Sequence, residues 1–377
     1  MKIFKILFIF SIINSVTVFA QELSNVQNVE FLTLLEKQNV TLSSNTKKWM
    51  KRYKGINLDD LTSFKFNELS GTTSVNLKIA KIDPTEEKGY KSYGTFMGLN
   101  DSGNPNAEIA YFNLATLLGV GERFRPVVRY QLGLTAQQEF KKLLNSTKLN
   151  GQTRNLNKTN LLKEIEKSKL LNGALKSKKS DTSIEFENLL KTTKFPKRRF
   201  LNPEYSFVKA IQANEPQPIS GKKVIVIKNY EGDEKELSRE LSIQLTLDVV
   251  FGQYDRFSGG NVVIEKDDNN MTHFISSDNG GADIIASSEI AERTAVLFSR
   301  YDKDIILKLR ALESFLKGET QEFYGYTDPL VFIKELGLYF IYSPERYKQA
   351  LINNFHELFE AVDANLKNHG EKIYFSN

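Results

Sequence analysis

Two loops separated by a short hairpin decide the fold of this chain: Phe251-Gly-Gln-Tyr-Asp-Arg-Phe-Ser-Gly-Gly-Asn261 and Ser277-Asp-Asn-Gly280. The apolar segments between them read as two strands around a turn-rich connection. A hairpin brings its two ends together, so Asp255 and Asn261 at its entrance should lie close to Asp278 at its exit. Carboxylate and amide oxygens are the ligands that Mg²⁺ and Mn²⁺ prefer. The two loops therefore predict a compact metal site.

A strongly apolar segment, Leu237 to Phe251, precedes the first loop. Leu241, Leu245 and Val249 recur at helical spacing and form one stripe, which predicts a packed helix. Gly252 is expected to end this helix, because glycine readily adopts the left-handed backbone of a helix C-terminus. The predicted site thus begins directly after the end of an apolar helix.

A lysine upstream is a candidate phosphate ligand. Side chains alternate across a strand, so Lys81 should share one face with Val75, Leu77 and Ile79. A lysine at the end of an apolar row can simply extend its charge into solvent. The pattern Leu-Lys-Ile-Ala-Lys is also similar to the lysine-bearing strand of kinase small lobes, which favours contact with ATP phosphates. The backbone amides of the preceding turn would then cover the phosphates: Gly71, Thr72 and Thr73.

A carboxylate on an apolar helix is the next candidate. Asn104 and Pro105 open a helix as N-cap and first helical residue, and Gly119 ends it. Helical spacing places Glu108 on the stripe that should be packed, where a charge is costly unless it is paired or metal-bound. The helix dipole alone also favours a first-turn Glu. We expect Glu108 to pair with Lys81 or to lie near the metal.

Together these segments resemble the secretory-pathway kinases that include the Golgi casein kinase and the xylosylkinase of proteoglycan synthesis. The resemblance covers roughly Ser70 to Leu312 and rests on three motifs: Asn106-Ala-Glu-Ile-Ala-Tyr-Phe-Asn-Leu114, Phe251-Gly-Gln-Tyr-Asp-Arg256 and Asp278-Asn-Gly280. It implies an α+β, bilobal protein-kinase-like fold with a small mixed β/α lobe and a mainly helical large lobe. It also implies transfer from ATP with Mn²⁺ or Mg²⁺.

The resemblance implies a role for each matched residue. Asp255 would be the catalytic base, and Lys81 with Glu108 would serve the nucleotide. Three residues would hold the metal: Asp278, Glu108 and Asn261. Phe257 departs from the pattern, because such kinases usually have His there, and Asn261 falls one place later than the metal Asn of phosphoinositide-kinase-like loops. An Asp-Arg-Phe loop with a displaced Gly-Asn is also similar to that of actin-fragmin kinase.

Composition limits the remaining chemistry. The chain has no cysteine, which excludes disulfides and thiolate chemistry, and its three histidines leave few ligands for a histidine-rich zinc site. His273 is expected to be an ordinary strand residue. Between Lys141 and Phe200, sixteen Lys and Arg oppose five Asp and Glu, in a chain with a net charge of +5. This segment is either a solvated, partly disordered insertion or a dock for an acidic substrate. It lacks interleaved aromatic residues, so no nucleic-acid partner is expected.

The N-terminus predicts the compartment. Residues 1–20 have two lysines, an apolar run and small residues before Gln21, which is typical of a secretory signal peptide. The alternative is an uncleaved anchor, although the run is shorter than the ~20 residues that span a bilayer. We expect an exported protein, periplasmic or secreted, of bacterial origin, with no stable membrane span after signal cleavage.

The expected organisation follows from these patterns. Residues 21–60 form an N-terminal helical extension, and residues 61–377 form the kinase-like domain. Within this domain the small lobe covers about 61–136, the basic insertion about 137–200 and the large lobe about 201–377.

Three functions remain open from the sequence. The first is an exported ATP-dependent phosphotransferase acting on a protein or glycan hydroxyl. The second is a catalytically inactive pseudokinase-like module for nucleotide binding or scaffolding, which Phe257 and the scarcity of ATP outside the cytoplasm favour. The third, a hydrolase built on Asp255 and Asp278, leaves Lys81 and Glu108 unexplained. Asp255 beside Arg256 could also be no more than an internal ion pair.

Overall fold

The computed structural model describes residues 27–375, except for short gaps at 39, 41, 72–73, 100–102, 181–182, 186–189, 193–198, 202–203, 213–215, 217–222, 228–229, 257–259, 268–269, 286–287 and 340. The expected signal peptide at residues 1–20 and the candidate residues Thr72, Thr73 and Phe257 lie outside the described residues. Within the described part, no helix is long and apolar enough to cross a membrane.

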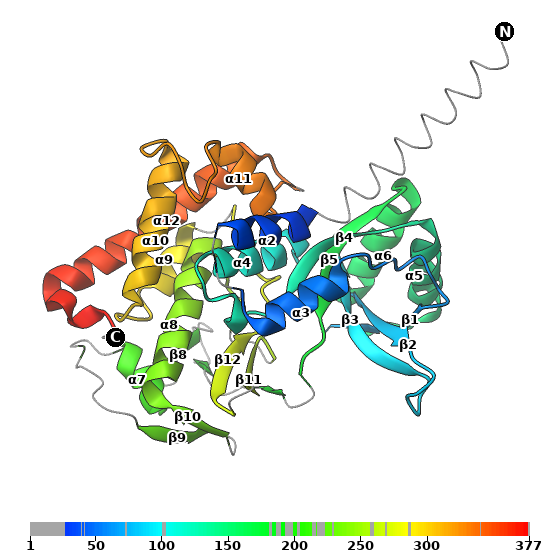
Figure 1. The fold of residues 1–377 in the computed structure, drawn as a ribbon, viewed down its shortest axis with the longest axis horizontal. Coiled ribbons are helices and arrows are strands. Elements are labelled where there is room, and N and C mark those ends of the chain that lie inside the picture. Colours follow the sequence, from blue (N-terminus) through cyan, green and yellow to red (C-terminus); the bar gives the residue numbers. More distant parts are fainter. Residues whose placement is uncertain are drawn as a thin grey trace, which may run out of the picture.

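The small lobe is built on a five-stranded antiparallel sheet with the order β1-β2-β3-β5-β4 (Figure 1). Its strands are β1 (Phe64–Ser70), β2 (Asn76–Ile82), β3 (Tyr90–Gly98), β4 (Val127–Leu132) and β5 (Leu171–Ser177). Apolar side chains of one face pack against α3 (Ser44–Tyr53), α5 (Leu134–Ser146) and α6 (Gln152–Lys167). The opposite face is directed toward α4 (Pro105–Leu117) and the large lobe.

The large lobe is mainly helical, and α8 (Glu234–Phe251) runs through its core. Beside α8 lies the hairpin of β11 (Val262–Lys266) and β12 (Thr272–Ser276), which β6 (Ile184–Glu185) extends to three strands. The remaining helices are α2 (Gln27–Lys37), α7 (Ser206–Gln212), α9 (Ser288–Ala295), α10 (Lys303–Lys317), α11 (Pro329–Leu336) and α12 (Pro344–His369). The short elements are η1 (Gly121–Arg123), η2 (Gly370–Ile373) and the strand pairs β7 (Leu190–Thr192) with β8 (Arg199–Leu201) and β9 (Val224–Ile227) with β10 (Tyr230–Asp233).

The helix α4 begins, and the helix α8 ends, where the sequence predicts. The Asn104 side chain caps α4 by accepting hydrogen bonds from the backbone N–H groups of Asn106 and Ala107, at 3.0 and 3.3 Å. Gly252 ends α8 with a φ of +62°, in the left-handed region that favours glycine. Every residue of α4 is buried, so this helix forms part of the core between the lobes.

The expectation of a solvated insertion at residues 137–200 was wrong for its first forty residues. Leu161 of α6 and Leu171 of β5 are buried in the core of the small lobe, and β5 lies inside the sheet between β3 and β4. Long lysines can cover a packed helix with their charges in solvent, so a basic composition alone does not indicate disorder.

His273 lies on β12, as the sequence predicts, and joins this strand to α8. Its Nδ1 is 2.6 Å from Glu240 Oε1 and its Nε2 is 3.3 Å from Asp267 Oδ2. Although burial opposes the charged ring, the hydrogen bond and charge of Glu240 raise the pKa of His273. The folded protein therefore holds this proton more tightly than the unfolded chain does.

This pKa shift predicts a pH-dependent stability. A raised pKa in the folded state contributes stability below the ordinary pKa of His, and the contribution is lost as pH rises through the raised value. Between pH 5.5 and pH 9, the melting temperature of the wild-type protein should fall further than that of His273→Gln. Equal losses in the two proteins would show that the Glu240 pair contributes nothing to stability.

Candidate active site

The start of α4 is docked on the loop that follows β12. The backbone N–H of Asn104 donates to the carbonyl of Gly280 at 2.8 Å. A Cβ added at Gly280 would lie 3.3 Å from the Met97 side chain of β3, so the loop also lies close against the sheet. The two lobes and α4 thus meet around residues 278–280.

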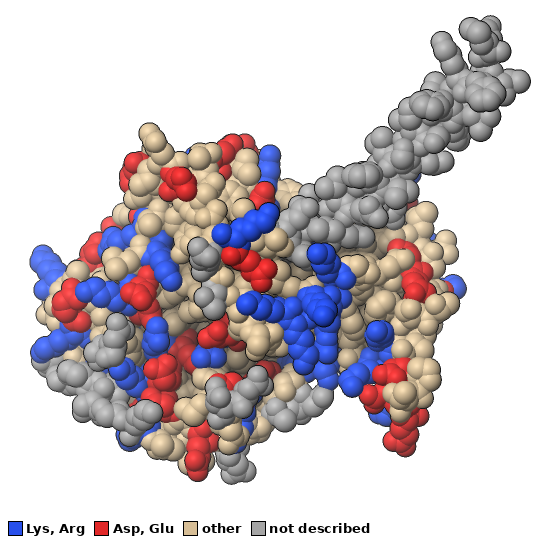
Figure 2. Space-filling view, viewed as in Figure 1, with Lys and Arg blue, Asp and Glu red and all other residues tan. Residues whose placement is uncertain are grey.

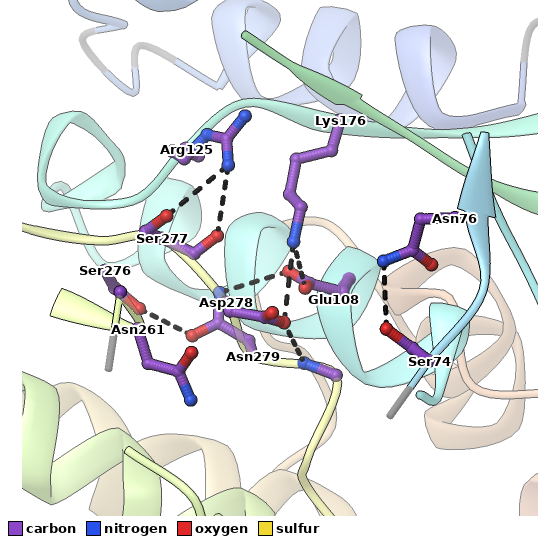
Figure 3. Close-up of polar contacts among 12 residues, drawn as sticks. Ser74, Asn76, Glu108, Arg125, Lys176, Asn261, Ser276, Ser277, Asp278 and Asn279 are labelled. Carbon is purple, nitrogen blue, oxygen red and sulfur yellow. Dashed lines mark hydrogen bonds and ion pairs between the residues drawn. The ribbon is translucent and has the colours of Figure 1, made fainter. Parts of the chain in front are cut away.

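Lys176 and Glu108 form a buried ion pair at this meeting point (Figure 3). Lys176 Nζ on β5 is 2.5 Å from Glu108 Oε1 on α4 and 3.5 Å from Asp278 Oδ1. The Glu108 side chain is fully buried, whereas 44% of the Asp278 side chain is exposed. Asn279 Nδ2 also donates to Glu108 Oε2, at 3.4 Å. One ammonium group therefore stands between two carboxylates, of which only Asp278 is open to solvent.

The two carboxyl groups differ in proton affinity. Burial raises the pKa of Glu108 to about 7, and the charge of Asp278 acts in the same direction while Lys176 opposes both. Burial also disfavours the Asp278 carboxylate, but the Lys176 ammonium holds the pKa of Asp278 below its usual range. The pKa values of two neighbouring carboxyl groups commonly move apart, because ionisation of one disfavours ionisation of the other. Of the two, Asp278 is therefore the carboxyl group that gives up its proton more readily.

Asp255 lies across the hairpin from Asp278, as predicted. Asn261 Nδ2 donates to the Asp255 carbonyl at 2.5 Å and reaches its Oδ2 at 3.4 Å. Gln253 accepts from the Asp255 backbone N–H at 3.2 Å and donates to the Asp278 carbonyl at 3.4 Å. A Cβ added at Gly281 would lie 2.9 Å from the Asp255 Cβ, so the two loops are in close contact.

Arg256 does not pair with Asp255. It is buried and forms a salt bridge of 2.7 Å with Asp248 of α8, which also accepts from the Tyr111 hydroxyl at 2.8 Å. The same guanidinium donates to Ser276 Oγ at 2.6 Å and to Asn279 Oδ1 at 2.8 Å. Arg256 therefore fixes the loop that carries Asp278 to the helix core.

The predicted pairing of Lys81 with Glu108 was wrong. Glu108 pairs with Lys176, and Lys81 lies farther along the sheet, opposite Lys91. Lys176 and Lys78 are both paired with Thr95, so these residues share the face toward α4. The row Val75, Leu77 and Ile79 lies on the opposite face, in the core beneath α5 and α6. Lys81 itself is exposed and lies opposite Lys91, three pairs or about 10 Å along the sheet from Lys78.

The sequence did contain a signal for Lys176. The segment Gly173-Ala-Leu-Lys176 has the small, apolar and lysine order of the Val-Ala-Ile-Lys strand that binds phosphates in kinases. The basic composition around it concealed the strand. This lysine follows Glu108 along the chain, whereas the lysine was expected to precede it.

The candidate phosphate-covering turn lies near the site. Gly71 has a φ of +97°, and a Cβ there would clash with Ser74, so glycine is required at this turn. Asn76, just beyond it, is paired with Met97, the residue whose side chain contacts Gly280. Asn76 Nδ2 donates to Ser74 Oγ at 3.1 Å (Figure 3). The end of the sheet that carries Gly71 therefore faces the Asp278 loop.

Asp278, Glu108 and Asn261 are the predicted ligands of a divalent cation. Among the described residues, no group of three or more His, Cys, Asp or Glu forms a metal site. Magnesium often binds through only one or two carboxylates and takes its other ligands from phosphates and water. Asp278 and Glu108 are two such carboxylates, but both Glu108 oxygens already accept hydrogen bonds, from Lys176 and Asn279, so their role as metal ligands stays a prediction. The side chain of the third predicted ligand, Asn261, donates to Asp255, and its role as a metal ligand remains a prediction.

Comparison with solved structures finds a similar fold in hydra Fam20, solved with sugar. The match has a TM-score of 0.54 and covers 89% of this chain and 94% of that chain, at 15% sequence identity. No protein-family model and no curated protein matches the sequence. The chain thus has the α+β, bilobal protein-kinase-like fold that its sequence predicts. The resemblance to the secretory-pathway kinases is confirmed at the level of the fold.

Proposed function

We propose that this protein is an exported phosphotransferase that moves the γ-phosphoryl group of ATP to a hydroxyl of a protein or glycan. The position of Lys176 between Glu108 and Asp278, beside the loop that bears Asp255, carries this proposal. A buried cation next to an exposed carboxylate matches the needs of a metal-bound triphosphate. The kinase-like fold of the Fam20 neighbour and the sugar in that structure add support for a glycan acceptor.

Each residue has a task in this proposal. Lys176 would donate to phosphate oxygens, and Glu108 would hold the ammonium in place. Asp278, with Glu108, would hold Mg²⁺ or Mn²⁺, which offsets charge on the phosphates when bound. Gly71 and its turn would cover the phosphates from the sheet.

The chemical step requires one base and an aligned acceptor. The hydroxyl oxygen of the acceptor forms a bond to the γ-phosphorus, and the bond from that phosphorus to the bridging oxygen of ADP breaks. Asp255 would accept the hydroxyl proton, while Asn261 and Gln253 hold the loop in place. The products are a phosphate ester and ADP.

Two variants test the proposal. Asp255→Asn should lower transfer by about 10²–10⁴-fold, because general-base catalysis contributes that much, yet keep ATP and Mn²⁺ binding. Asp278→Ala should abolish the thermal stabilisation that ATP with Mn²⁺ gives. Transfer is measured with labelled ATP on the protein itself and on peptide and glycan panels.

The outcomes separate the functions that the sequence left open. Nucleotide binding without transfer in the wild type would favour the pseudokinase-like module. ATP consumption without a phosphorylated acceptor would favour a hydrolase. Absence of nucleotide binding in the wild type would contradict the whole proposal.

A further inference from the structure

A strongly basic pocket lies beside α3 and η1. Its volume is about 380 Å³, and it is bounded by α3, the end of η1, the end of β5 and the hairpin residues Glu265 and Ile275. Two carboxylates, Glu122 and Glu265, face six cations: Lys48, Arg52, Lys91, Arg125, Lys178 and Lys179. Figure 2 shows Lys and Arg side chains gathered on the surface near α3. Lys91 and Lys179 also pair with Glu86 and Glu185, at 3.1 and 2.8 Å, and the remaining excess of positive charge favours an anion.

Arg125 gives this pocket a buried, incompletely satisfied donor. Its Nη1 reaches the carbonyl and hydroxyl of Ser277, both at 3.4 Å, and its Nη2 donates to the Ser177 carbonyl. Its Nε has no hydrogen-bond partner among the described residues, although the side chain is buried. An unsatisfied buried donor is costly, and an anion in this pocket would satisfy it.

Arg52 also lines the pocket, and its side chain is positioned by Trp49. Its guanidinium lies over the Trp49 ring, 4.6 Å from the centroid, and its carbonyl accepts from the Tyr93 hydroxyl at 2.8 Å. Lys48, one helical turn earlier, has no carboxylate within ion-pair distance in the described part of the chain. A planar guanidinium with an ammonium beside it is suited to the oxygens of a phosphate or sulfate group.

The pocket borders the site described above, because Arg125 also reaches Ser277, the residue before Asp278, but the two differ in their lining. Its lining includes none of Glu108, Lys176, Asp255 or Asp278. It adjoins a second basic depression of about 640 Å³, whose lining shares Arg52, Lys91 and Lys178. The combined space is large enough for a ligand that carries more than a bare ion.

We propose that this pocket is a second binding site, which takes a small ligand with a phosphate or sulfate ester group. The tetrahedral, anionic head would accept hydrogen bonds from Arg125 Nε, Arg52 and Lys48 together. The remainder of the ligand would extend along the shared wall toward the second depression. This site does not depend on transfer of phosphate from ATP, and it holds whether or not the cleft is catalytic.

Binding to the full chain tests the proposal. Inorganic phosphate, inorganic sulfate, glucose 6-phosphate and glucosamine 6-sulfate are titrated by calorimetry and thermal shift, with sodium chloride at matched ionic strength. Saturable binding of phosphate or sulfate is expected, and the two sugar esters identify which ester is preferred. The double variant Lys48→Gln with Arg52→Gln should weaken binding at least about tenfold, because two charged hydrogen bonds are removed.

Matched controls exclude general charge effects. Lys141→Gln with Lys142→Gln removes the same charge from exposed positions on α5, and this variant should bind as the wild type does. Arg125→Lys keeps the charge but loses the planar group, so it should also weaken binding about tenfold. The proposal is overturned if the control variant loses as much affinity, or if chloride stabilises the wild type equally. Absence of saturable binding in the wild type also overturns it.

A second comparison separates the two sites. Asp278→Ala should bind phosphate with wild-type affinity but lose stabilisation by ATP with Mn²⁺. The Lys48→Gln, Arg52→Gln variant should show the reverse pattern. If Asp278→Ala loses phosphate binding, the anion binds in the cleft and the second site does not exist.

Discussion

Lys176→Met is expected to remove nucleotide binding, whereas Lys81→Met leaves it unchanged. Lys176 is buried against Glu108 and faces Asp278, but Lys81 is exposed at the far end of β2. Loss of a desolvated charge that meets a phosphate costs several kcal/mol, so affinity for ATP with Mn²⁺ should fall by roughly 100-fold. Thermal shift and calorimetry on the two variants measure this directly.

The same variant should show a distinctive pH dependence of stability. Without Lys176, burial and Asp278 raise the pKa of Glu108 further above its ordinary value. A raised folded-state pKa stabilises at low pH and loses that contribution as pH rises through the raised value. At pH 9 the unpaired Glu108 must be ionised or bind a proton unfavourably, which costs about 3–5 kcal/mol in free energy of unfolding. At pH 5 the cost should be much smaller.

Two results would contradict this assignment. Equal loss of nucleotide affinity in Lys81→Met and Lys176→Met would mean that neither lysine is specific to the site. A Lys176→Met protein with wild-type affinity and a stability deficit at pH 9 would make Lys176 a structural partner of Glu108 only. Lys81→Met serves as the control for stability as well, because an exposed substitution typically changes it by less than about 0.5 kcal/mol.

Local signals predicted the elements that frame the site. Asn104 and Pro105 at the start of α4 and Gly252 at the end of α8 act through short-range hydrogen bonds and backbone conformation, which a sequence displays directly. The hairpin that joins Asp255 to Asp278 is also local, since its strands are adjacent in the chain. These predictions needed no knowledge of long-range packing.

The assignment of the lysine failed because it depends on strand order. Alternation along β2 correctly grouped Leu77 and Ile79, but alternation does not say which face meets α4. That choice is made by β5, which joins the sheet between β3 and β4 after two intervening helices. Only this non-local pairing brings Lys176 opposite Thr95 and over Glu108.

The network around Arg256 depends on the same non-local contacts. Its partners come from α8, from β12 and from the loop after β12, and Tyr111 of α4 shares Asp248 with it. From sequence, the neighbouring Asp255 was an equally good partner. In the structure Asp255 is half-buried, and Arg256 instead joins Asp248 of α8 to Asn279 of the loop that carries Asp278.

Arg256→Met is expected to lower the stability of the fold strongly at neutral pH. Both Arg256 and Asp248 are buried, so removal of the guanidinium leaves an uncompensated carboxylate in the core. Such a loss costs about 3–5 kcal/mol in free energy of unfolding. Urea denaturation of the single variant, of Asp248→Leu and of the double variant measures the coupling between the two residues. An apolar pair of similar volume can replace a buried ion pair, so the double variant should regain most of the stability.

The double variant Arg256→Met with Asp248→Leu separates the stability of the fold from the positioning of the loop that carries Asp278. Without Arg256, Ser276 Oγ, the Asn279 side chain and the Asp278 carbonyl lose the donor that holds their loop. A displacement of about 1 Å at a reacting group can lower a rate by about 10²-fold. The stabilised double variant should therefore remain deficient in transfer by roughly that factor, with nucleotide affinity changed much less. Wild-type transfer in the double variant would mean that Arg256 serves only the stability of the core, because the Asp278 loop would then hold its position without it.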